Sequence, residues 1–304
     1  MKIAYLICAH TDCTQLNRLI KALTYHQQTG FFVHLDQKST IPPKDVQAPQ
    51  NALELNVSKL ININWGGYSQ CEAILVLIKR AMESKKEYDR LVYISGLDYP
   101  IWPNSQILSY FKEHRNKECI MALNLSELKE PRKMPERIKA YHFFRDSKIG
   151  NPQLKHLLCG GMRRITRLFF FKHRNHFNGM PVYEGSSWWA LSRECLQYVL
   201  DYYRINGKQI RTYFKYTFAP DEMMLHTLVF NSPFGKNALL YTEKNYPGLV
   251  GLTPLHYIEY NGGISVYKEK DYDKLLISEK MFCRKVETGV SDELMNKIDL
   301  YRNE

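Results

Sequence analysis

The chain has 304 residues, of which 44% are hydrophobic, and this is enough to bury one sizeable core. Its formal net charge of +11 favours an anionic partner, which can be nucleic acid, a membrane surface or a small molecule. The sequence contains no ribonucleoprotein motif, zinc-finger spacing or Gly-rich phosphate loop, so we expect no nucleic-acid partner, and the charge indicates a nucleotide or an anionic membrane.

The seven cysteines are scattered and form no Cys-x-x-Cys pair, so neither a zinc site nor a disulfide framework is expected. The 21 tyrosines favour a ligand that is flat or sugar-like. The apolar run at residues 3–8 is too short for a signal peptide, and no run is long enough to span a bilayer. We therefore expect a cytoplasmic protein.

The N-terminal part of the chain alternates predicted strands and helices. Residues 3–8 form a continuous apolar run, apolar residues recur at helical spacing over 16–23, and residues 31–35 are apolar again. This pattern predicts a βαβ unit. Further strands are predicted at 60–63 and 91–95.

Carboxylates follow two of these strands. Asp36 ends the run at 31–35, and Asp98 comes shortly after the run at 91–95. Open α/β sheets bind ligands at this carboxyl edge, although each Asp can equally cap the next turn. Ser69 and Glu72 predict a capping box in front of a buried helix.

Residues 146–178 are basic and contain an apolar cluster at 168–171, which includes Phe169, Phe170 and Phe171. An apolar cluster flanked by cations is typical of a helix at an anionic membrane surface. A buried helix with solvated ends explains the same pattern equally well.

Residues 185–191 predict a strand, and Ser192 predicts the N-cap of the following helix. Pro220, Asp221 and Glu222 predict the start of another helix, whose dipole would keep carboxylates ionised. Such a carboxylate could serve as a general base, although Pro-Asp-Glu is also an ordinary way to begin a helix.

Six motifs occur in order: residues 3–10 (IAYLICAH), 32–39 (FVHLDQKS), 95–101 (SGLDYPI), 185–194 (GSSWWALSRE), 220–222 (PDE) and 282–285 (FCRK). Together they resemble the core-2/I-branching glycosyltransferase family, which also holds the peptide O-xylosyltransferases. The resemblance runs over nearly the whole chain. It implies an α/β, GT-A-like single domain over 1–304 with a mixed central sheet. A Rossmann-like half at 1–125 would mainly bind a UDP-sugar, and 126–304 would mainly bind the acceptor and catalyse transfer.

The resemblance also implies roles for particular residues. Glu222 matches the catalytic base, and Arg284 with Lys285 matches the basic pair that binds the diphosphate. The donor side is further expected to contain His10, Asp36 and Asp98. The acceptor side is expected to contain Arg137, Ser186, Trp188, Trp189 and Asp221.

The resemblance implies inversion at the anomeric carbon and transfer without a divalent metal or other cofactor. The predicted strand at 91–95 leads to a single Asp98 instead of an Asp-x-Asp motif, and one carboxylate is a poor site for Mg²⁺ or Mn²⁺. The literal Asp-x-Asp at Asp271 and Asp273 precedes a short predicted helix near the C-terminus, so helix capping is its expected task. Cationic side chains must then neutralise the phosphates.

The chain departs from the family pattern in two places. The branching members carry an arginine upstream of the matched lysine, where this chain has residues 260–263 (YNGG). They also carry an acidic acceptor-binding residue after an Asn-Leu pair, whereas Asn124-Leu125 is followed here by Ser126 and then Glu127. The identity of the acceptor therefore cannot be inherited from the family.

We expect a metal-independent inverting glycosyltransferase that moves GlcNAc or xylose from a UDP-sugar to a glycan hydroxyl. We expect no counterpart of the anchor and stem of the eukaryotic members, so the chain resembles a compact prokaryotic member that builds surface polysaccharide. Two further expectations are a lipid-linked acceptor and peripheral contact with the inner face of the membrane. The alternative is a non-catalytic protein that binds carbohydrate or anionic membrane on a decayed scaffold. The presence of Glu222, Arg284 and Lys285 argues against that alternative.

Overall fold

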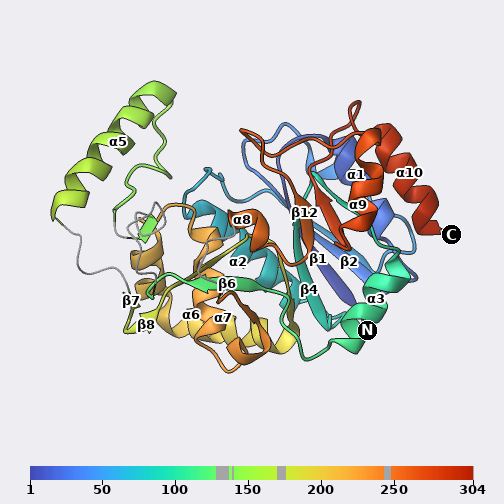
Figure 1. The fold of residues 1–304 in the computed structure, drawn as a ribbon, viewed down its shortest axis with the longest axis horizontal. Coiled ribbons are helices and arrows are strands. Elements are labelled where there is room, and N and C mark those ends of the chain that lie inside the picture. The colour runs from blue at the N-terminus through green and yellow to red at the C-terminus, as the bar shows by residue number, and fades with distance from the viewer. Residues whose placement is uncertain (128–136, 139, 170–175, 243–247, 304) are drawn as a thin grey trace.

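The N-terminal part of the chain builds a five-stranded sheet (Figure 1). The computed structural model describes residues 1–127, 137–138, 140–169, 176–242 and 248–303. The strands of this sheet are β1 (Ile3–Ala9), β2 (Thr29–Leu35), β3 (Glu54–Ser58), β4 (Arg90–Ser95) and β10 (Trp189–Ser192). Their order is β10-β4-β1-β2-β3, and every neighbouring pair is parallel except β10 with β4. This arrangement confirms the predicted βαβ unit and the predicted mixed sheet.

Helices cover both faces of the sheet, which explains why β1 and β2 are apolar throughout. The helices involved are α1 (Cys13–Leu23), α2 (Ser69–Met82), α3 (Asn104–Glu113) and α6 (Arg193–Phe214). Alternate residues of β1 enter two separate cores: Tyr5 packs with α1 and α3, and Leu6 packs with α2 and α6. The parallel strands therefore present their carboxyl ends, and the loops that follow them, at one edge.

Two smaller sheets join distant parts of the chain. One pairs β6 (Met121–Asn124) with β9 (Tyr183–Gly185) and β11 (Leu239–Leu240). The other pairs β13 (Phe282–Arg284) with β5 (Asp98–Pro100) and β12 (His256–Ile258). The second sheet brings the C-terminal basic motif directly against the strand that follows β4.

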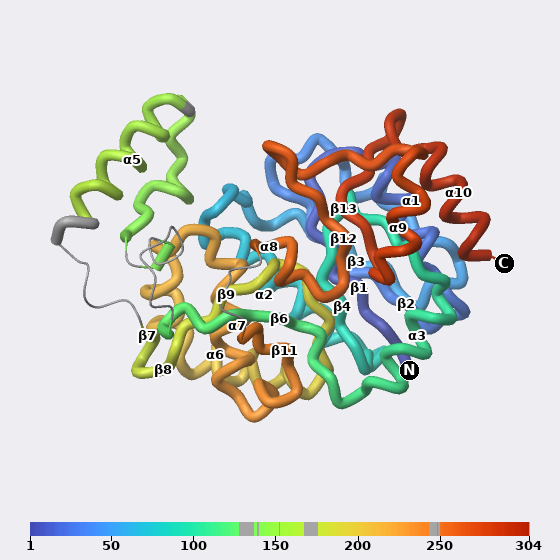
Figure 2. Tube along the Cα trace, in the orientation of Figure 1, coloured from blue at the N-terminus to red at the C-terminus, as the bar shows by residue number. Residues whose placement is uncertain are grey.

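The remaining elements lie around these sheets. They are the hairpin β7 (His176–Phe177) and β8 (Met180–Pro181), the helices α5 (Pro152–Phe169), α7 (Met224–Phe230), α8 (Gly248–Gly251), α9 (Tyr272–Ile277) and α10 (Asp292–Asn303), and the 3-10 turns η1 (Pro43–Asp45), η2 (Pro220–Glu222), η3 (Gly235–Asn237) and η4 (Glu269–Asp271). The Cα trace shows α5 standing away from the sheets, whereas α10 lies beside α1 (Figure 2). Arg18 of α1 fixes α10 through a 2.9 Å contact with Asp299.

Three local predictions are wrong. The strand predicted at 60–63 does not form, and the strand that pairs with β2 is β3, which lies just before it. The predicted capping box of α2 does not form, because the Tyr68 and Ser69 amides donate to the Asp146 carboxylate instead. The segment predicted as one strand at 185–191 is divided between β9 and β10.

The predicted cap at Ser192 is confirmed, since its side chain accepts a hydrogen bond from the Cys195 amide. The helix predicted to begin at Pro220 is interrupted. Pro220–Glu222 form the 3-10 turn η2, Met223 has a non-helical backbone (φ −133°), and α7 begins at Met224. Of the phenylalanine cluster, Phe170 and Phe171 and the side chain of Phe169 lie outside the described residues. Across the ranges that the structure describes, no helix combines the length and the apolar character needed to cross a bilayer.

Candidate active site

Arg284 and Asp98 lie directly opposite each other in the antiparallel pairing of β13 with β5. Arg284 Nη1 donates to Asp98 Oδ1 at 2.8 Å, and it also contacts the Ser95 hydroxyl. The Ser95 amide donates to the second Asp98 oxygen at 2.7 Å. Asp98 is completely buried, so this carboxylate holds the guanidinium at the end of β4 rather than facing solvent.

His256 completes the surroundings of Asp98. Its Nε2 lies 3.1 Å from Asp98 Oδ2, and both side chains are buried. Burial alone would raise the pKa of Asp98, but Arg284 and His256 outweigh it and hold that pKa below its usual range. Asp98 therefore stays ionised, and its lone pairs are used by protein donors.

Lys285 follows Arg284 and has a different environment. Its ammonium lies 2.8 Å from the Glu287 carboxylate, and 27% of its side chain is exposed. A partly exposed ion pair of this kind exchanges partners at small cost. Lys285 can therefore turn to an incoming anion, while Arg284 remains fixed by Asp98.

Glu222 ends the turn η2 and shares one arginine with a second carboxylate. Arg137 Nη1 donates to Glu222 Oε2 and to Glu184 Oε1, both at 2.5 Å. The Glu184 side chain is fully buried, and that of Glu222 is 17% exposed. Burial, opposed by Arg137 and reinforced by Asp221 and Glu184, raises the pKa of Glu222 to about 8. Burial likewise raises the pKa of Glu184 to about 7 against the effect of Arg137.

Asp221, the neighbour of Glu222, connects η2 to the segment between β9 and β10. Ser187 Oγ donates to Asp221 Oδ2 at 2.7 Å, and both side chains are buried. Burial raises the pKa of Asp221 in spite of this hydrogen bond. Asp221 therefore anchors the turn that presents Glu222.

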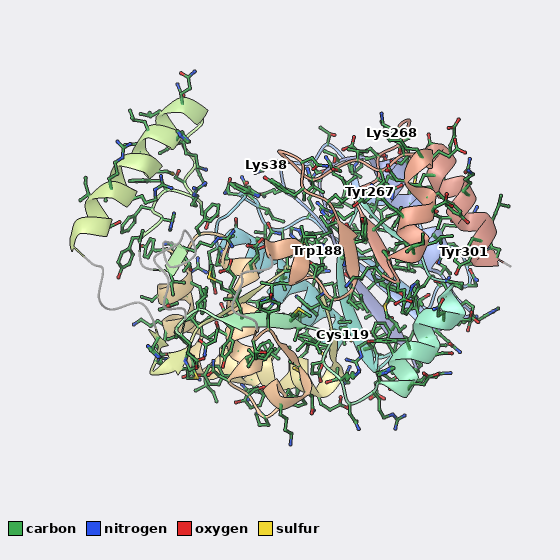
Figure 3. The ribbon with its side chains drawn as sticks, in the orientation of Figure 1. Lys38, Cys119, Trp188, Tyr267, Lys268 and Tyr301 are labelled. Atoms are coloured by element: carbon green, nitrogen blue, oxygen red, sulfur yellow. The ribbon has the colours of Figure 1, made fainter. Side chains whose placement is uncertain are left out.

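Trp188 continues this connection to the basic strand. The Arg284 guanidinium lies 5.1 Å from the centre of the Trp188 ring, and the His256 ring lies 5.4 Å from it. Figure 3 shows Trp188 near the C-terminal strands. Ser187 contacts the acidic turn η2, and its neighbour Trp188 contacts the Arg284 guanidinium. Carboxylates therefore lie at one end of this short segment and a cation lies at the other.

The other two residues expected on the acceptor side have buried side chains. Trp189 is fully buried in β10 and stacks on Tyr93 with ring centres 5.5 Å apart, so its ring is used in core packing. Ser186 is also buried, and its hydroxyl accepts the Trp188 amide at 3.3 Å. The polar contact to the carboxylate turn comes from Ser187 instead.

His10 and Asp36 lie at the carboxyl ends of β1 and β2. His10 is exposed, and Asp36 is buried. The Asp36 carboxylate accepts the Lys38 amide at 2.9 Å and lies 3.7 Å from the Lys38 ammonium. Asp36 therefore closes the turn after β2, while its position at the sheet edge is the one expected for a ligand-binding residue.

The structure adds three residues that the sequence reasoning missed: Glu184, Ser187 and His256. Ser187 lies inside the quoted GSSWW motif, so the motif located it without distinguishing it from Ser186. Glu184 and His256 had no such signal. Each is recognised only from its fully buried side chain and its charged partner, Arg137 for Glu184 and Asp98 for His256.

The arrangement offers no ready metal site among the residues that the structure describes, where no group of three His, Cys, Asp or Glu side chains has the required spacing. Asp271 precedes α9 but makes no side-chain capping hydrogen bond to that helix, and its carboxylate instead accepts the Lys268 amide at 2.9 Å at the start of η4. It also lies 3.0 Å from the Lys274 ammonium.

Comparison with known proteins identifies the family. A family model described as "Branch: Core-2/I-Branching enzyme" matches residues 3–261. Xylosyltransferase 2 of Rattus norvegicus is 26% identical over 313 residues, which is 99% of this chain and 34% of that protein. The xylosyltransferase of Ciona intestinalis is 24% identical over 98% of this chain and 34% of its own length. The chain thus spans about a third of the length of these relatives.

Among solved structures, S. aureus TarS (residues 1–349) aligns with 81% of this chain and 59% of its own, at 16% identity and a TM-score of 0.40. The family match covers most of the chain, and the xylosyltransferase alignments continue through the basic motif at Arg284. The chain therefore belongs to the core-2/I-branching enzyme family.

Proposed function

We propose that this protein transfers GlcNAc or xylose from a UDP-sugar to a hydroxyl of a glycan, with inversion at the anomeric carbon and without a divalent metal. The observation that carries the proposal is the Ser187–Trp188 bridge. It joins the turn that presents Glu222 to the guanidinium of Arg284. This connection supports the proposal, because transfer needs a base beside the acceptor hydroxyl and positive charge beside the departing UDP.

Glu222 is the proposed general base. Its carboxylate would take the proton of the acceptor hydroxyl while the oxygen forms a bond to the anomeric carbon from the face opposite UDP. A carboxylate whose pKa is raised to about 8 is a stronger base than an ordinary one once it is ionised. Activity is then expected to rise with pH through this range, because the protonated form of Glu222 cannot accept the proton.

Arg284 and Lys285 are proposed to receive the departing UDP. As the bond between the sugar and the β-phosphate breaks, its electron pair remains on the phosphate oxygen, and the two cations stabilise that charge. Arg284 is already positioned by Asp98, so little reorganisation is needed. Lys285 would exchange Glu287 for the phosphate.

Independence from a divalent metal is proposed because of what surrounds Asp98. Its oxygens are engaged by Arg284, by His256 and by the Ser95 amide, so a cation would have to displace protein donors to bind there. We propose that His10 and Asp36 contribute to the nucleotide side and that Arg137, Trp188 and Asp221 shape the acceptor side. Residues 1–125 and 126–304 would be the corresponding halves of one domain.

We further propose a role in surface polysaccharide synthesis in the cytoplasm, at the inner face of the membrane. The net charge of +11 supports contact with anionic lipid. The two assignments are separable, because the chemistry at Glu222 does not require the membrane.

The direct test is transfer by the purified protein, supplied with a panel of UDP-sugars and glycan acceptors in the presence of EDTA. We expect UDP release with formation of a product whose anomeric configuration, measured by NMR, is opposite to that of the donor. Strict dependence on Mn²⁺, or retained configuration, would refute the proposal. Binding of UDP-sugar with no transfer to any acceptor would favour the non-catalytic alternative.

A further inference from the structure

Helix α5 turns its apolar face to solvent. Leu154, Leu157 and Ile165 are 47%, 70% and 51% exposed, and their spacing places them on one side of the helix. In an ordinary surface helix such a stripe faces the core. The helix also stands apart from the sheets (Figures 1 and 2). Its apolar side therefore has no counterpart among the described residues.

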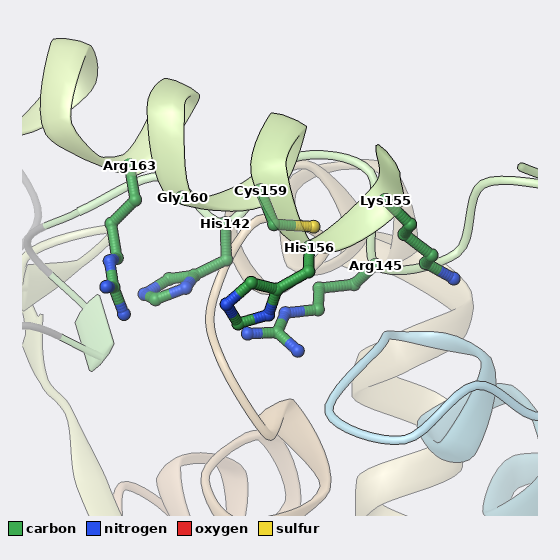
Figure 4. A pocket seen from close by; sticks show the side chains of 7 residues that line it. All are labelled: His142, Arg145, Lys155, His156, Cys159, Gly160 and Arg163. Atoms are coloured by element: carbon green, nitrogen blue, oxygen red, sulfur yellow. The ribbon is translucent and has the colours of Figure 1, made fainter. Parts of the chain in front are cut away.

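The opposite, polar side of α5 faces the protein and lines a cavity of about 240 Å³. Figure 4 shows the side chains of Arg163 and His156 below the helix, close to those of His142 and Arg145 from the segment beneath it. Lys155, Cys159 and Gly160 complete the lining. The space is many times the roughly 10–15 Å³ that a cavity needs to hold one water molecule, so it can hold a hydrated phosphoryl group.

Among the described residues, the lining carries cationic groups and no carboxylate. Asp146, next to Arg145 in sequence, is directed elsewhere, because it caps α2 through the Tyr68 and Ser69 amides. Within the described part of the chain, Arg145 and Arg163 form no ion pair, and the buried Nε of Arg145 has no hydrogen-bond partner. Burial and the nearby Arg163 lower the pKa of Arg145. An anion in this cavity would relieve that repulsion.

The cavity is connected to the proposed active site through Phe218. The Arg145 guanidinium lies 4.7 Å from the centre of the Phe218 ring, and the Arg137 guanidinium lies 5.4 Å from it. The Phe218 amide also donates to the Arg137 carbonyl at 3.2 Å. Arg137 in turn binds Glu222. The cavity is therefore linked through Phe218 and Arg137 to Glu222.

We propose that α5 and the cavity beneath it bind a phosphate-bearing lipid, with the phosphoryl group among Arg145, Arg163 and Lys155 and the outward leucines of α5 in the acyl region. Charge complementarity identifies the headgroup as anionic, and the exposed apolar stripe identifies its source as a membrane rather than a free phosphate. The assignment of this lipid as the carrier of the acceptor glycan rests on the proposed function. The lipid site itself does not.

The test is flotation of the full chain with vesicles of pure phosphatidylcholine or of phosphatidylcholine containing phosphatidylglycerol. We expect binding to the anionic vesicles and little binding to the neutral ones. Arg163→Ala should weaken binding about fivefold, the effect expected of one basic residue near an anionic surface. Leu157→Asp should weaken it about tenfold or more, because the substitution removes an inserted apolar group and adds a like charge.

The chain supplies matched controls on α6. Arg204→Ala changes an arginine whose side chain is 78% exposed, and Ile205→Asp changes an isoleucine that is 76% exposed. Both should bind anionic vesicles as well as the unmodified protein does. Arg145→Met should also weaken binding. Arg163 is the better test position, because its side chain is exposed and its replacement should not disturb folding.

Equal binding to neutral and anionic vesicles, or equal losses in the α5 and α6 variants, would overturn the proposal. The proposal would also be overturned if the protein bound inorganic pyrophosphate through Arg163, in the presence of saturating UDP, but did not bind vesicles. Glu222→Gln should bind vesicles normally. Failure of the catalytic proposal and failure of the lipid proposal are therefore distinguishable.

Discussion

Arg137 lies 2.5 Å from Glu222, and the same Nη1 atom lies 2.5 Å from the buried Glu184. One guanidinium therefore holds two carboxylates whose pKa values burial raises to about 8 for Glu222 and about 7 for Glu184. This sharing makes the basicity of Glu222 adjustable in both directions by single substitutions.

Arg137→Met should shift the pH–rate profile for transfer to higher pH. Arg137 lowers the pKa of Glu222, so its removal raises that pKa further, and a higher pH is needed to ionise the base. Below pH 8 the rate should fall relative to the unmodified protein. Arg204→Met, which changes an exposed arginine on α6, is the control and should leave the profile in place. If the pH–rate profile of Arg137→Met were unchanged, the pKa of Glu222 would not determine that profile.

Glu184→Gln should produce the opposite shift. The Glu184 carboxylate raises the pKa of Glu222, so a neutral amide at this position lowers it, and transfer should begin at a lower pH. The amide oxygen can still accept the Arg137 hydrogen bond, which preserves the local geometry. The pH dependence of kcat, measured beside that of Arg137→Met, checks the sign. Shifts in the same direction for both variants would contradict the shared-arginine interpretation.

Asp98→Asn should destabilise the protein and weaken UDP binding together. It removes the carboxylate between Arg284 and His256 and leaves a largely buried guanidinium without its counter-charge, which costs about 3–5 kcal/mol. Urea unfolding and calorimetric titration with UDP would measure the two effects. Asp36→Asn, at the end of β2, is the control for stability only, and it should cost only about 1 kcal/mol, because it weakens hydrogen bonds in a turn. Equal losses of stability at the two positions would argue against a special role for Asp98.

The adjacent tryptophans should behave differently from each other. Trp188→Ala removes the ring against which Arg284 packs and should weaken UDP binding with a small loss of stability. Trp189→Ala opens a cavity in the core and should lower the free energy of unfolding by about 3–5 kcal/mol. Urea unfolding and UDP titration of both variants would test this division. The reverse outcome would mean that the Trp188 ring does not help to position Arg284 for UDP binding.

Much of the fold could be predicted from local pattern. The strands β1, β2 and β4 are continuous apolar runs, and the Ser192 cap is specified by residues within one helical turn. The pairing of β13 with β5 was not visible in either segment alone. It depends on a contact between residues 186 positions apart, Asp98 and Arg284, although the family resemblance had placed both on the donor side.

The errors have a common physical origin in long-range partners. The N-terminus of α2 is capped by Asp146, which lies 77 residues beyond Ser69, so the local Ser-x-x-Glu signal was misleading. Trp188 and Trp189 are indistinguishable by type, and only the packing of Trp189 in β10 against Tyr93 buries it in the core. Likewise, only the contact with Asp221, 34 residues away, distinguishes Ser187 from Ser186.

The most direct test of the central claim is the rate of sugar transfer by Glu222→Gln, measured together with its affinity for UDP. The substitution removes the proton-accepting carboxylate but keeps the size of the side chain. We expect kcat to fall by about 10²- to 10⁴-fold with UDP affinity unchanged. Undiminished transfer by this variant would contradict the assignment of Glu222 as the base.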